Sequence, residues 1–454
     1  MKMNRYFWIA FIYLFLFSCE KDEPAYNDKG QPEPPLPPVE FEIPATEDII
    51  MYEVNERAFS ATGDLQGVID GLGHIESLSI NVIWLMPIHP IGQVNSVNSP
   101  YSVQNFLEVN QEYGTVEDLI MLVDKAHEKG MAVILDWVAN HTAWDNPWII
   151  NTDWYTQDGN GNIVHPPGTN WLDVADLNYD NQNMRQAMIE AMEFWIDIAD
   201  IDGFRCDAAD MVPFDFWKQA IDSLSLFTTK DLIMLAEGAR GDHFTAGFDM
   251  NFGWEFYGNL KDVFSGNATP NQLLSIHQNT LNNLPAGKMK LLFTTNHDES
   301  AWDATPMILF NGKQGALAAS VISIFLTGVP LIYDGQEVGE TDNIQFFSND
   351  PINWSLNPDM LAGYIKLLDI YSNSETARKG ALATYDHSTV AAFTLSSEQE
   401  QLFILVNTKD NEVIFNFPDE LAGNSWTDLD SGTNFGGQEQ VILSPYHYLV
   451  LEEN

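Results

Sequence analysis

"TVEDLIMLVDKAHEKGMAVILDW", residues 115–137, holds the pattern that decides the fold, a helix followed directly by a buried strand. Its first part has apolar residues at helical spacing and ends at Gly130, a typical helix stop. Its second part, Met131–Trp137, is an apolar run, interrupted only by Asp136, of the kind buried on both faces of a sheet. The apolar residues that share one face of the helix are Leu119, Leu122, Val123 and Ala126. The stretch therefore predicts one unit of a parallel sheet covered by helices.

The same alternation continues on both sides of this stretch. Strand-like runs lie at residues 49–55, 81–87, 131–137, 202–207, 232–237, 289–298 and 329–335. Helical patterns lie at residues 64–79, 115–130, 184–200, 213–225 and 314–326. So many units within residues 45–372 favour an α/β fold closed into a (β/α)8 TIM barrel, and the alternative is a doubly wound open sheet.

Two regions break the alternation. About forty residues after His141 show little periodicity, and we place an insertion at about residues 142–178. A long irregular segment inside a compact domain is usually functional. Residues 375–454 contain short alternating runs such as "QLFILVN" and "EVIFNF", so we expect a C-terminal all-β domain, a β-sandwich.

The composition limits the classes of partner. The chain has 454 residues, 45% of them hydrophobic, and 65 acidic against 20 basic residues give a formal net charge of −45. Such a surface repels nucleic acid and anionic lipid, so we expect no nucleic-acid partner. An uncharged substrate is compatible with this acidic surface.

The N-terminal residues indicate export and a lipid anchor. Lys2 and Arg5 precede the apolar run Tyr6–Phe17, which is too short to span a bilayer. Residues 1–19 resemble a bacterial lipoprotein signal peptide, which makes Cys19 the acylated residue. The following "CEKDE" resembles the tag that sends such lipoproteins to the cell surface in some Gram-negative bacteria. We therefore predict a surface-exposed outer-membrane lipoprotein that meets the membrane only through its lipid; an ordinary cleaved signal peptide is the alternative.

The next segment, residues 20–44, is predicted to be a tether. Residues 20–44 contain seven prolines and several acids, which is typical of a semi-rigid linker. If Cys19 carries lipid, Cys206 has no intramolecular partner, and no disulfide framework is expected.

Four apolar runs end in acids, and this pattern carries the chemistry. They are Asp136 in "ILDWVANH", Asp207 in "GFRCD", Glu237 in "LAEG" and Asp298 in "TTNHDE". Side chains at the carboxyl ends of barrel strands meet on one face, where the active site of such a barrel lies. Paired carboxylates without a cofactor motif indicate glycoside hydrolysis. The chain has no G-x-G-x-x-G loop, no Walker loop and no H-E-x-x-H or cysteine cluster for zinc.

These four segments in order resemble the signature regions of the α-amylase family, glycoside hydrolase family 13. "NVIWLMPI", "SPYSV", "VADLNYDN" and "GVPLIYDGQEVG" are similar to other recurring segments of that family. The likeness covers roughly residues 48–372, and the insertion occupies the place of the family's domain B. It implies a retaining enzyme that hydrolyses α-1,4-glucosidic bonds of starch-like glucans through a covalent intermediate.

The resemblance also implies roles for individual residues. Asp207 would be the nucleophile, Glu237 the acid/base, and Asp298 a ligand of the sugar hydroxyls. The expected substrate-binding residues are Tyr101, His141, Arg205 and His297. Among them, Arg205 would keep Asp207 ionised and oriented, because an arginine stays charged. Asp136 would support the site from behind by hydrogen bonding.

A calcium ion is common in the family, and its asparagine and aspartate ligands match Asn140 and Asp176 in this chain. Oxygen ligands of this kind suit calcium. We therefore expect a structural calcium held by Asn140 and Asp176, completed by backbone carbonyls.

The chain also departs from the family's pattern. Asp210 and Met211 stand where many α-amylases have a Lys-His pair that binds sugar on the leaving-group side, and Asn105 stands where an aspartate is frequent. We expect the leaving-group side to be recognised differently. An exo-acting or maltogenic amylase, an α-glucosidase and a glucanotransferase remain alternatives, as does a non-catalytic glycan-binding lipoprotein. Proteins that import the products at the cell surface are the expected partners.

Overall fold

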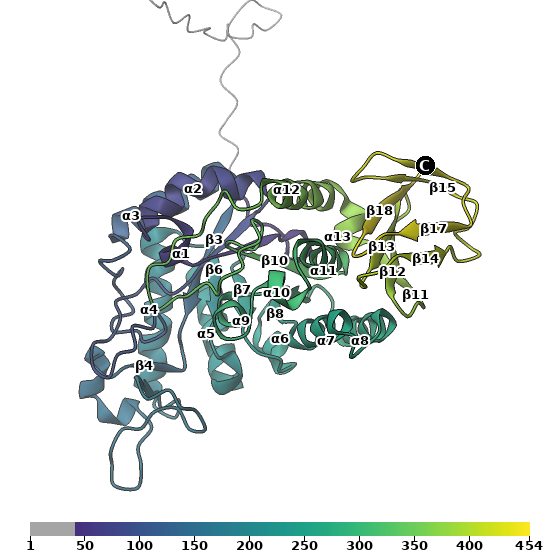
Figure 1. Cartoon of the computed structure of the whole chain (residues 1–454). Coiled ribbons are helices and arrows are strands. Elements are labelled where there is room, and N and C mark those ends of the chain that lie inside the picture. Colours follow the sequence, from purple (N-terminus) through teal and green to yellow (C-terminus); the bar gives the residue numbers. More distant parts are fainter. Residues whose placement is uncertain (1–40) are drawn as a thin grey trace, which may run out of the picture. The chain divides into compact units, whose positions relative to one another are not determined.

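The computed structural model describes residues 41–454, and these contain a closed barrel of eight parallel strands (Figure 1). The strand order around the barrel is β1-β10-β9-β8-β7-β6-β3-β2, and β1 pairs with both β10 and β2 to close it. The strands are β1 (Met51–Val54), β2 (Val82–Leu85), β3 (Ala132–Trp137), β6 (Gly203–Cys206), β7 (Ile233–Ala236), β8 (Met250–Phe252), β9 (Met289–Leu292) and β10 (Val329–Tyr333). The predicted fold class, a TIM barrel, is confirmed, and the open-sheet alternative is wrong.

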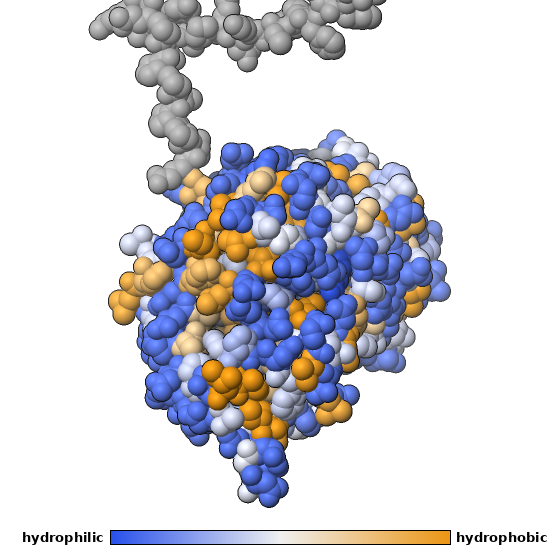
Figure 2. Space-filling model, turned by 90° about the vertical axis from the view of Figure 1, so that its left-hand side faces the viewer, coloured by the Kyte–Doolittle hydropathy of each residue, from blue (hydrophilic) through white to orange (hydrophobic). Residues whose placement is uncertain are grey.

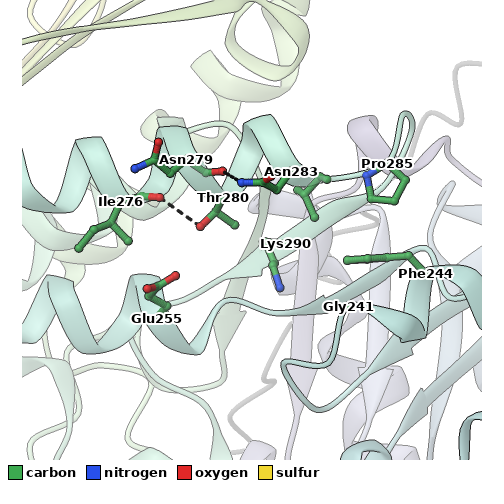
Figure 3. Close-up of a pocket in the computed structure, with 10 residues that line it drawn as sticks. Gly241, Phe244, Glu255, Ile276, Asn279, Thr280, Asn283, Pro285 and Lys290 are labelled. Carbon is green, nitrogen blue, oxygen red and sulfur yellow. Dashed lines mark hydrogen bonds between the residues drawn. The ribbon is translucent and has the colours of Figure 1, made fainter.

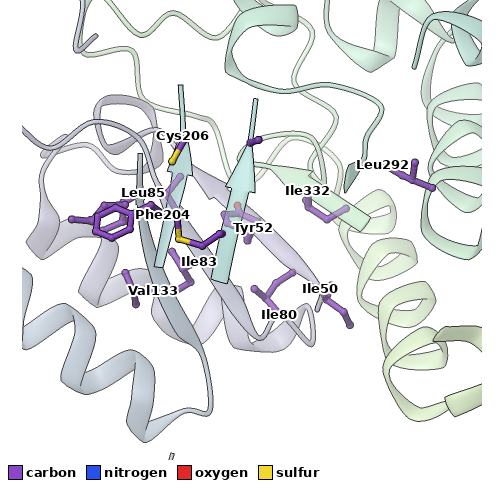
Figure 4. Close-up of a cluster of buried hydrophobic side chains, with 14 of the residues drawn as sticks. Ile50, Tyr52, Ile80, Ile83, Leu85, Val133, Phe204, Cys206, Leu292 and Ile332 are labelled. Atoms are coloured by element: carbon purple, nitrogen blue, oxygen red, sulfur yellow. The ribbon is translucent and has the colours of Figure 1, made fainter. Parts of the chain in front are cut away.

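Burial on both faces explains why these strands are continuous apolar runs. Every residue of β1, β2, β3, β6, β7 and β10 is buried. Phe204 and Cys206 point into the same packed layer as Leu85 and Val133 (Figure 4). Within the described residues Cys206 forms no disulfide and is fully buried, so this thiol is a core residue, as its alternation along the strand predicts.

Helices surround the strands (Figure 1). The longer ones are α2 (Leu65–Ser77), α3 (Val116–Glu128), α4 (Gln182–Ala199), α5 (Phe214–Phe227), α7 (Trp254–Ser265), α8 (Pro270–Asn283), α11 (Lys313–Phe325) and α12 (Pro358–Asn373). The shorter ones are α1 (Glu56–Phe59), α6 (Asp242–Ala246), α9 (His297–Trp302), α10 (Pro306–Leu309) and α13 (Glu375–Lys379), with 3-10 turns at Thr46–Asp48 and Ala209–Met211. Thr115 and Asp118 form a capping box at the start of α3, which fixes where this helix begins.

The insertion of residues 142–178, called domain B below, adds little regular structure. A two-stranded antiparallel sheet joins β4 (His141–Ala143) to β5 (Val174–Asp176), and 3-10 turns lie at Pro147–Ile150 and Thr152–Trp154. Because β4 follows the end of β3, this small sheet places domain B over the carboxyl ends of the barrel strands.

The C-terminal strands form a separate antiparallel layer (yellow in Figure 1). The strands are β11 (Ala381–Tyr385), β12 (Val390–Ser396), β13 (Gln401–Asn407), β14 (Val413–Asn416), β15 (Ser425–Asp428), β16 (Asn434–Gly436), β17 (Gln440–Leu443) and β18 (Tyr448–Glu453). In the described chain six of them make one sheet, and β14 and β17 make a second sheet of two strands. Phe403, Phe415 and Trp426 belong to the hydrophobic cluster between these strands.

The surface agrees with the acidic composition. On the face shown in Figure 2, hydrophilic residues predominate and hydrophobic residues gather in separate patches. Within residues 41–454 no helix combines the length and the hydrophobicity needed to cross a bilayer. The predicted signal peptide, Cys19 and most of the proline-rich linker lie outside the described residues.

Candidate active site

The predicted carboxylates meet at the carboxyl ends of neighbouring strands. Asp136 lies within β3, Asp207 directly follows β6, and Glu237 directly follows β7. The register pairs Asp136 with Arg205 across β3 and β6, and Cys206 with Ala236 across β6 and β7. Asp298 differs from the prediction, because β9 ends at Leu292 and Asp298 lies in the first turn of α9.

One guanidinium connects three of these carboxylates. Arg205 Nη1 lies 2.8 Å from Asp136 Oδ1 and 3.1 Å from Asp207 Oδ1, and Nη2 lies 3.1 Å from Glu237 Oε2. Arg205 is fully buried and packs 4.9 Å from the ring centroid of Trp84. It therefore holds Asp207 and Glu237 next to each other from beneath, and it does not line the substrate cavity described below.

Burial and mutual repulsion set the protonation of this cluster. Burial, followed by the charge of Glu237, raises the pKa of the Asp207 carboxyl well above its usual value, and Arg205 opposes that rise. Burial lowers the pKa of Arg205, but the carboxylates of Asp136 and Glu237 outweigh it and keep this side chain charged. Asp207 therefore keeps its proton to higher pH than an isolated aspartate would, because burial and the neighbouring carboxylate both disfavour its charged form.

The main chain fixes Glu237. The Ala208 N–H donates to Glu237 Oε2 at 2.7 Å, and the Ala209 N–H donates to the Glu237 carbonyl at 2.9 Å. Oε2 also lies 3.1 Å from Arg205 Nη2, so this one oxygen is held by two donors. Glu237 is thus held in one orientation, on the same guanidinium as Asp207.

His297 is held as a cation beside this pair. Nδ1 lies 2.5 Å from Glu53 Oε1, and Nε2 lies 2.7 Å from Tyr101 Oη and 3.6 Å from Asp298 Oδ2. Burial lowers the pKa of His297, but the Asp298 and Glu53 carboxylates overcome it and raise that pKa to about 9. Tyr101 Oη in turn donates to Asp136 Oδ2 at 2.9 Å.

His141, in contrast to His297, is uncharged. Burial lowers its pKa to about 4, so it is neutral near pH 7. Its Nε2 lies 3.2 Å from the Tyr101 carbonyl and its Nδ1 lies 3.2 Å from Asn140 Nδ2. Because a carbonyl only accepts, Nε2 carries the hydrogen and Nδ1 accepts from the amide.

A cavity of about 510 Å³ opens above these groups. Asp207, Asp298, Tyr101, His141 and His297 line its inner end. The cavity therefore brings together the predicted catalytic and substrate-binding residues except Arg205, which lies beneath, and Glu237, which is not among the described residues that line it.

Domain B contributes one aromatic residue to the cavity. Within the described chain, Trp171 is the only one of the five aromatics that crowd this insertion to line it. Trp144, Trp148 and Trp154 pack against the core, and Tyr155 is buried with its hydroxyl 2.9 Å from Thr142 Oγ1. Most of these aromatics are therefore packing residues.

Asp210 organises the loop after Glu237. Its carboxylate accepts hydrogen bonds from the Ala239 N–H at 3.0 Å and the Arg240 N–H at 3.2 Å, and Oδ1 lies 3.2 Å from His243 Nε2. Gly238, with φ +158°, would bring an added Cβ within 2.4 Å of Asp210. The position expected to recognise the leaving-group sugar thus holds the loop that carries Glu237.

The two predicted calcium ligands fit the ion in donor type. Asn140 and Asp176 are buried on adjoining segments, where Asp176 pairs with His141 and the Leu177 N–H donates to the Asn140 carbonyl at 3.2 Å. The Asn140 amide nitrogen faces His141, which leaves its oxygen for a cation. Among the described residues, no group of three or more His, Cys, Asp or Glu side chains could hold a metal, so backbone carbonyls would have to complete such a site.

A second cavity, of about 440 Å³, lies between α7 and α8 near Lys290 (Figure 3). No predicted site residue is among the described residues that line it. Thr280 and Asn283 direct their hydrogen bonds to carbonyls of their own helix, at Ile276 and Asn279 (Figure 3). Lys290 Nζ is bound to Asn251 Oδ1. Because no predicted catalytic residue lines this cavity, we place the reaction in the first cavity.

Sequence reasoning missed Glu53 and Trp302. Glu53 lies inside the strand-like run "IIMYEVN", where a charged residue in an apolar strand was the available signal. Trp302 ends α9, only four positions after Asp298, and lines the cavity.

Comparison with known proteins places this site in a family. The model of the alpha-amylase catalytic domain matches residues 45–162 and 169–414. Alpha-amylase MalA of Haloarcula japonica is 26% identical over 91% of this chain, which spans 64% of that protein's length. Alpha-amylase 3 of Dictyoglomus thermophilum is 26% identical over 91% of this chain and 94% of its own length. An alpha-amylase structure from Lactobacillus plantarum superposes with a TM-score of 0.81 at 27% identity, over 89% of this chain and 99% of that one. The chain belongs to the alpha-amylase family of glycoside hydrolases.

Proposed function

We propose that this protein hydrolyses α-1,4-glucosidic bonds of starch-like glucans or maltooligosaccharides with retention of configuration. The observation that carries the proposal is Arg205, whose two terminal nitrogens contact Asp207 and Glu237 at the ends of adjacent strands. This arrangement supplies an ionised nucleophile beside a proton donor, which is what a retaining mechanism needs.

In the first step an Asp207 carboxylate oxygen attacks the anomeric carbon from the face opposite the leaving oxygen. The bond between the anomeric carbon and that oxygen breaks, and Glu237 gives its proton to the departing sugar. Arg205 favours the ionised form of Asp207, which is the form that attacks. A covalent glucosyl ester on Asp207 results.

In the second step water takes the place of the departed sugar. Glu237, now a carboxylate, removes a proton from the water while the oxygen of that water attacks the anomeric carbon. The ester bond to Asp207 breaks, the aspartate regains its charge, and Glu237 is protonated again. Two inversions give net retention.

The remaining groups hold the attacked sugar. The cationic His297 and the carboxylate of Asp298 line the cavity together with Tyr101; Asp298 offers a charged acceptor for sugar hydroxyls, and His297 adds a positive charge beside it. His141, neutral near pH 7, adds a polar edge without a charge. These charged hydrogen bonds are stronger than those between neutral groups.

The experiment is product analysis. Purified protein should release reducing sugar from soluble starch, and chromatography of the products from amylose, pullulan and maltotriose should separate endo action from exo, maltogenic or transferring action. Cys206→Ser should lose little activity, because this thiol lies in the core. Inactivity of folded protein on every α-glucan, with and without calcium, would contradict the proposal and favour a glycan-binding protein.

We also propose that the enzyme acts at the cell surface, anchored in the outer membrane through lipid on Cys19, where it passes products to uptake proteins. Its support is the sequence of residues 1–19. Metabolic labelling with a palmitate analogue should mark the wild type and not Cys19→Ser. Unlabelled wild-type protein would contradict the anchor.

A structural calcium between domain B and the barrel completes the proposal. Asn140 and Asp176 would hold it, and a bound cation would stabilise the link between β3 and domain B. Chelation should lower the melting temperature of wild-type protein, and Asp176→Asn should remove that sensitivity. Equal melting with and without chelator would exclude the site.

A further inference from the structure

The loop that follows Glu237 is held from two sides. It joins β7 to α6, and on one side Asp210 accepts hydrogen bonds from the N–H groups of Ala239 and Arg240 at 3.0 and 3.2 Å. On the other side the amide nitrogen of Asn251 donates to the Arg240 carbonyl at 3.2 Å. The N–H and the carbonyl of Arg240 are therefore both bound, a short way along the chain from Glu237.

Asn251 is an unusual residue for a strand of this barrel. It is fully buried in the middle of β8, between Met250 and Phe252. A buried amide costs free energy unless its polar atoms are hydrogen-bonded. The register places Asn251 opposite Ala236, the residue that directly precedes Glu237. The amide thus meets the loop close to the point where the chain leaves β7.

Lys290 fixes the orientation of this amide. It pairs with Asn251 in the register of β8 and β9, and its Nζ donates to Asn251 Oδ1 at 2.5 Å. An ammonium group only donates and a carbonyl only accepts, so the amide oxygen must face Lys290 and the amide nitrogen must face Arg240. The two contacts are therefore coupled, because turning the amide over would break both.

The surroundings of Lys290 show that its charge is kept at a cost. The side chain is partly buried and lies between Glu255 of α7 and Phe244 of α6 (Figure 3). Burial lowers the pKa of Lys290, and the carboxylates of Glu255 and Asp210 oppose that fall. Desolvation of an ammonium group is unfavourable unless the group is hydrogen-bonded. The interaction that Lys290 supplies in return is its hydrogen bond to Asn251.

We propose that Asn251 and Lys290 are positioning residues for Glu237: they hold the loop that follows it and thereby keep its carboxyl within reach of the leaving oxygen. The proposal rests on the proposed function, in which Glu237 gives its proton to the departing sugar. Neither residue is among the described residues that line the cavity with Asp207, so both act through the main chain. A displaced acid transfers its proton more slowly, because the transfer requires hydrogen-bond reach.

The first test compares two substrates that differ in their need for an acid. Maltoheptaose has a leaving oxygen that must be protonated, whereas dinitrophenyl α-maltotrioside releases a phenolate that needs no proton. Lys290→Met should lower kcat/KM for maltoheptaose about tenfold, through kcat and not KM, and leave the aryl glycoside within about twofold of wild type. Lys290 lines a cavity, so this change opens no void in the core. Lys290→Arg, which can still donate to Asn251, should restore most of the loss.

Asn251→Asp separates the two contacts of the amide. The carboxylate can still accept from Lys290, but it cannot donate to the Arg240 carbonyl, so the loss on maltoheptaose should match that of Lys290→Met. Lys218→Met, which removes a lysine from an exposed ion pair on α5, is the matched control and should change neither value. Equal losses on both substrates in Lys290→Met, or no loss on either, would overturn the positioning role.

Hydrogen exchange follows the loop without any turnover. Lys290→Met should speed exchange in the peptide of residues 238–244 about tenfold and leave α3 unchanged, because only this loop loses a contact. Unchanged exchange in that peptide would overturn the proposal while hydrolysis stands. A wild type that cleaves neither substrate, with faster exchange in Lys290→Met, would overturn the proposed function and keep only the contact between Lys290, Asn251 and the loop.

Discussion

Oε1 of Glu53 lies 2.5 Å from Nδ1 of His297, and both side chains are buried. This contact gives the site a definite direction of hydrogen bonding. A doubly protonated His297 donates from Nδ1 to Glu53 and from Nε2 to Tyr101 Oη, and Tyr101 donates onward to Asp136. Asp136 also accepts from Arg205. The donor and acceptor of each hydrogen bond are therefore set along the chain that runs from Glu53 on β1 to Arg205 on β6.

Glu53→Gln should move the alkaline limb of the pH profile. The Glu53 charge helps to raise the pKa of His297 to about 9, so the imidazole is charged below that pH and loses its proton above it. Without the carboxylate the pKa of His297 falls, and the decline of kcat/KM at high pH should begin at lower pH. The neighbouring buried Glu56→Gln, which has no contact with His297, is the control. An unshifted limb in Glu53→Gln would show that Glu53 does not maintain the charge of His297.

Asp210→Ala should lower kcat more than it changes KM. The substitution removes the acceptor of two backbone N–H groups in the loop that follows Glu237, and each lost hydrogen bond costs about 1 kcal/mol. We expect kcat to fall on the order of tenfold, with Asp210→Asn intermediate. Asp215→Asn, which alters the ion pair between the exposed Asp215 and the buried Arg185, is the control. A raised KM with unchanged kcat would instead show that Asp210 touches the leaving-group sugar.

His277→Gln should make the protein less sensitive to acid. Burial lowers the pKa of His277 from 6.5 to about 4, and its Nε2 lies 3.0 Å from the carbonyl of Thr327, which precedes β10. Between pH 6.5 and pH 4 the unfolded chain binds a proton that the folded chain does not, so the free energy of unfolding falls as the pH drops.

Glutamine can still donate to Thr327 but cannot titrate. The slope of unfolding free energy against pH should therefore decrease by up to about 1.4 kcal/mol per pH unit in this window. Denaturant titrations between pH 4 and pH 7.5 measure this slope. Above pH 6.5 the slopes of the wild type and of His277→Gln should be the same. Identical slopes would show that His277 does not contribute.

The sequence predicted those features that depend on periodicity. Seven of the barrel strands are long apolar runs and were found, whereas β8 has only three residues and was not. The helices α7 and α8 were also missed, because their apolar residues are mixed with many polar ones. Asp298 was placed at a strand end, but the chain continues from β9 into a short helix before reaching it.

The site was predicted only as far as its local patterns allow. Asp207 and Glu237 follow buried strands, so their meeting follows from parallel topology. Glu53 and Trp302 could not be assigned in the same way, because their roles arise from contacts across 244 residues and across the cavity. The sequence shows that Asp210 departs from the family's Lys-His pattern, but only the structure shows which backbone groups its carboxylate binds.

The central claim is that Asp207 forms a covalent glucosyl intermediate beside Glu237. The most direct measurement is mass spectrometry of the protein after incubation with 5-fluoro-α-glucosyl fluoride, a donor whose intermediate is released slowly. We predict one added sugar on the peptide that contains Asp207, in wild type and in Cys206→Ser, and no adduct in Asp207→Asn with the fold intact. A stable adduct on any other residue, or an adduct that persists in Asp207→Asn, would contradict the account.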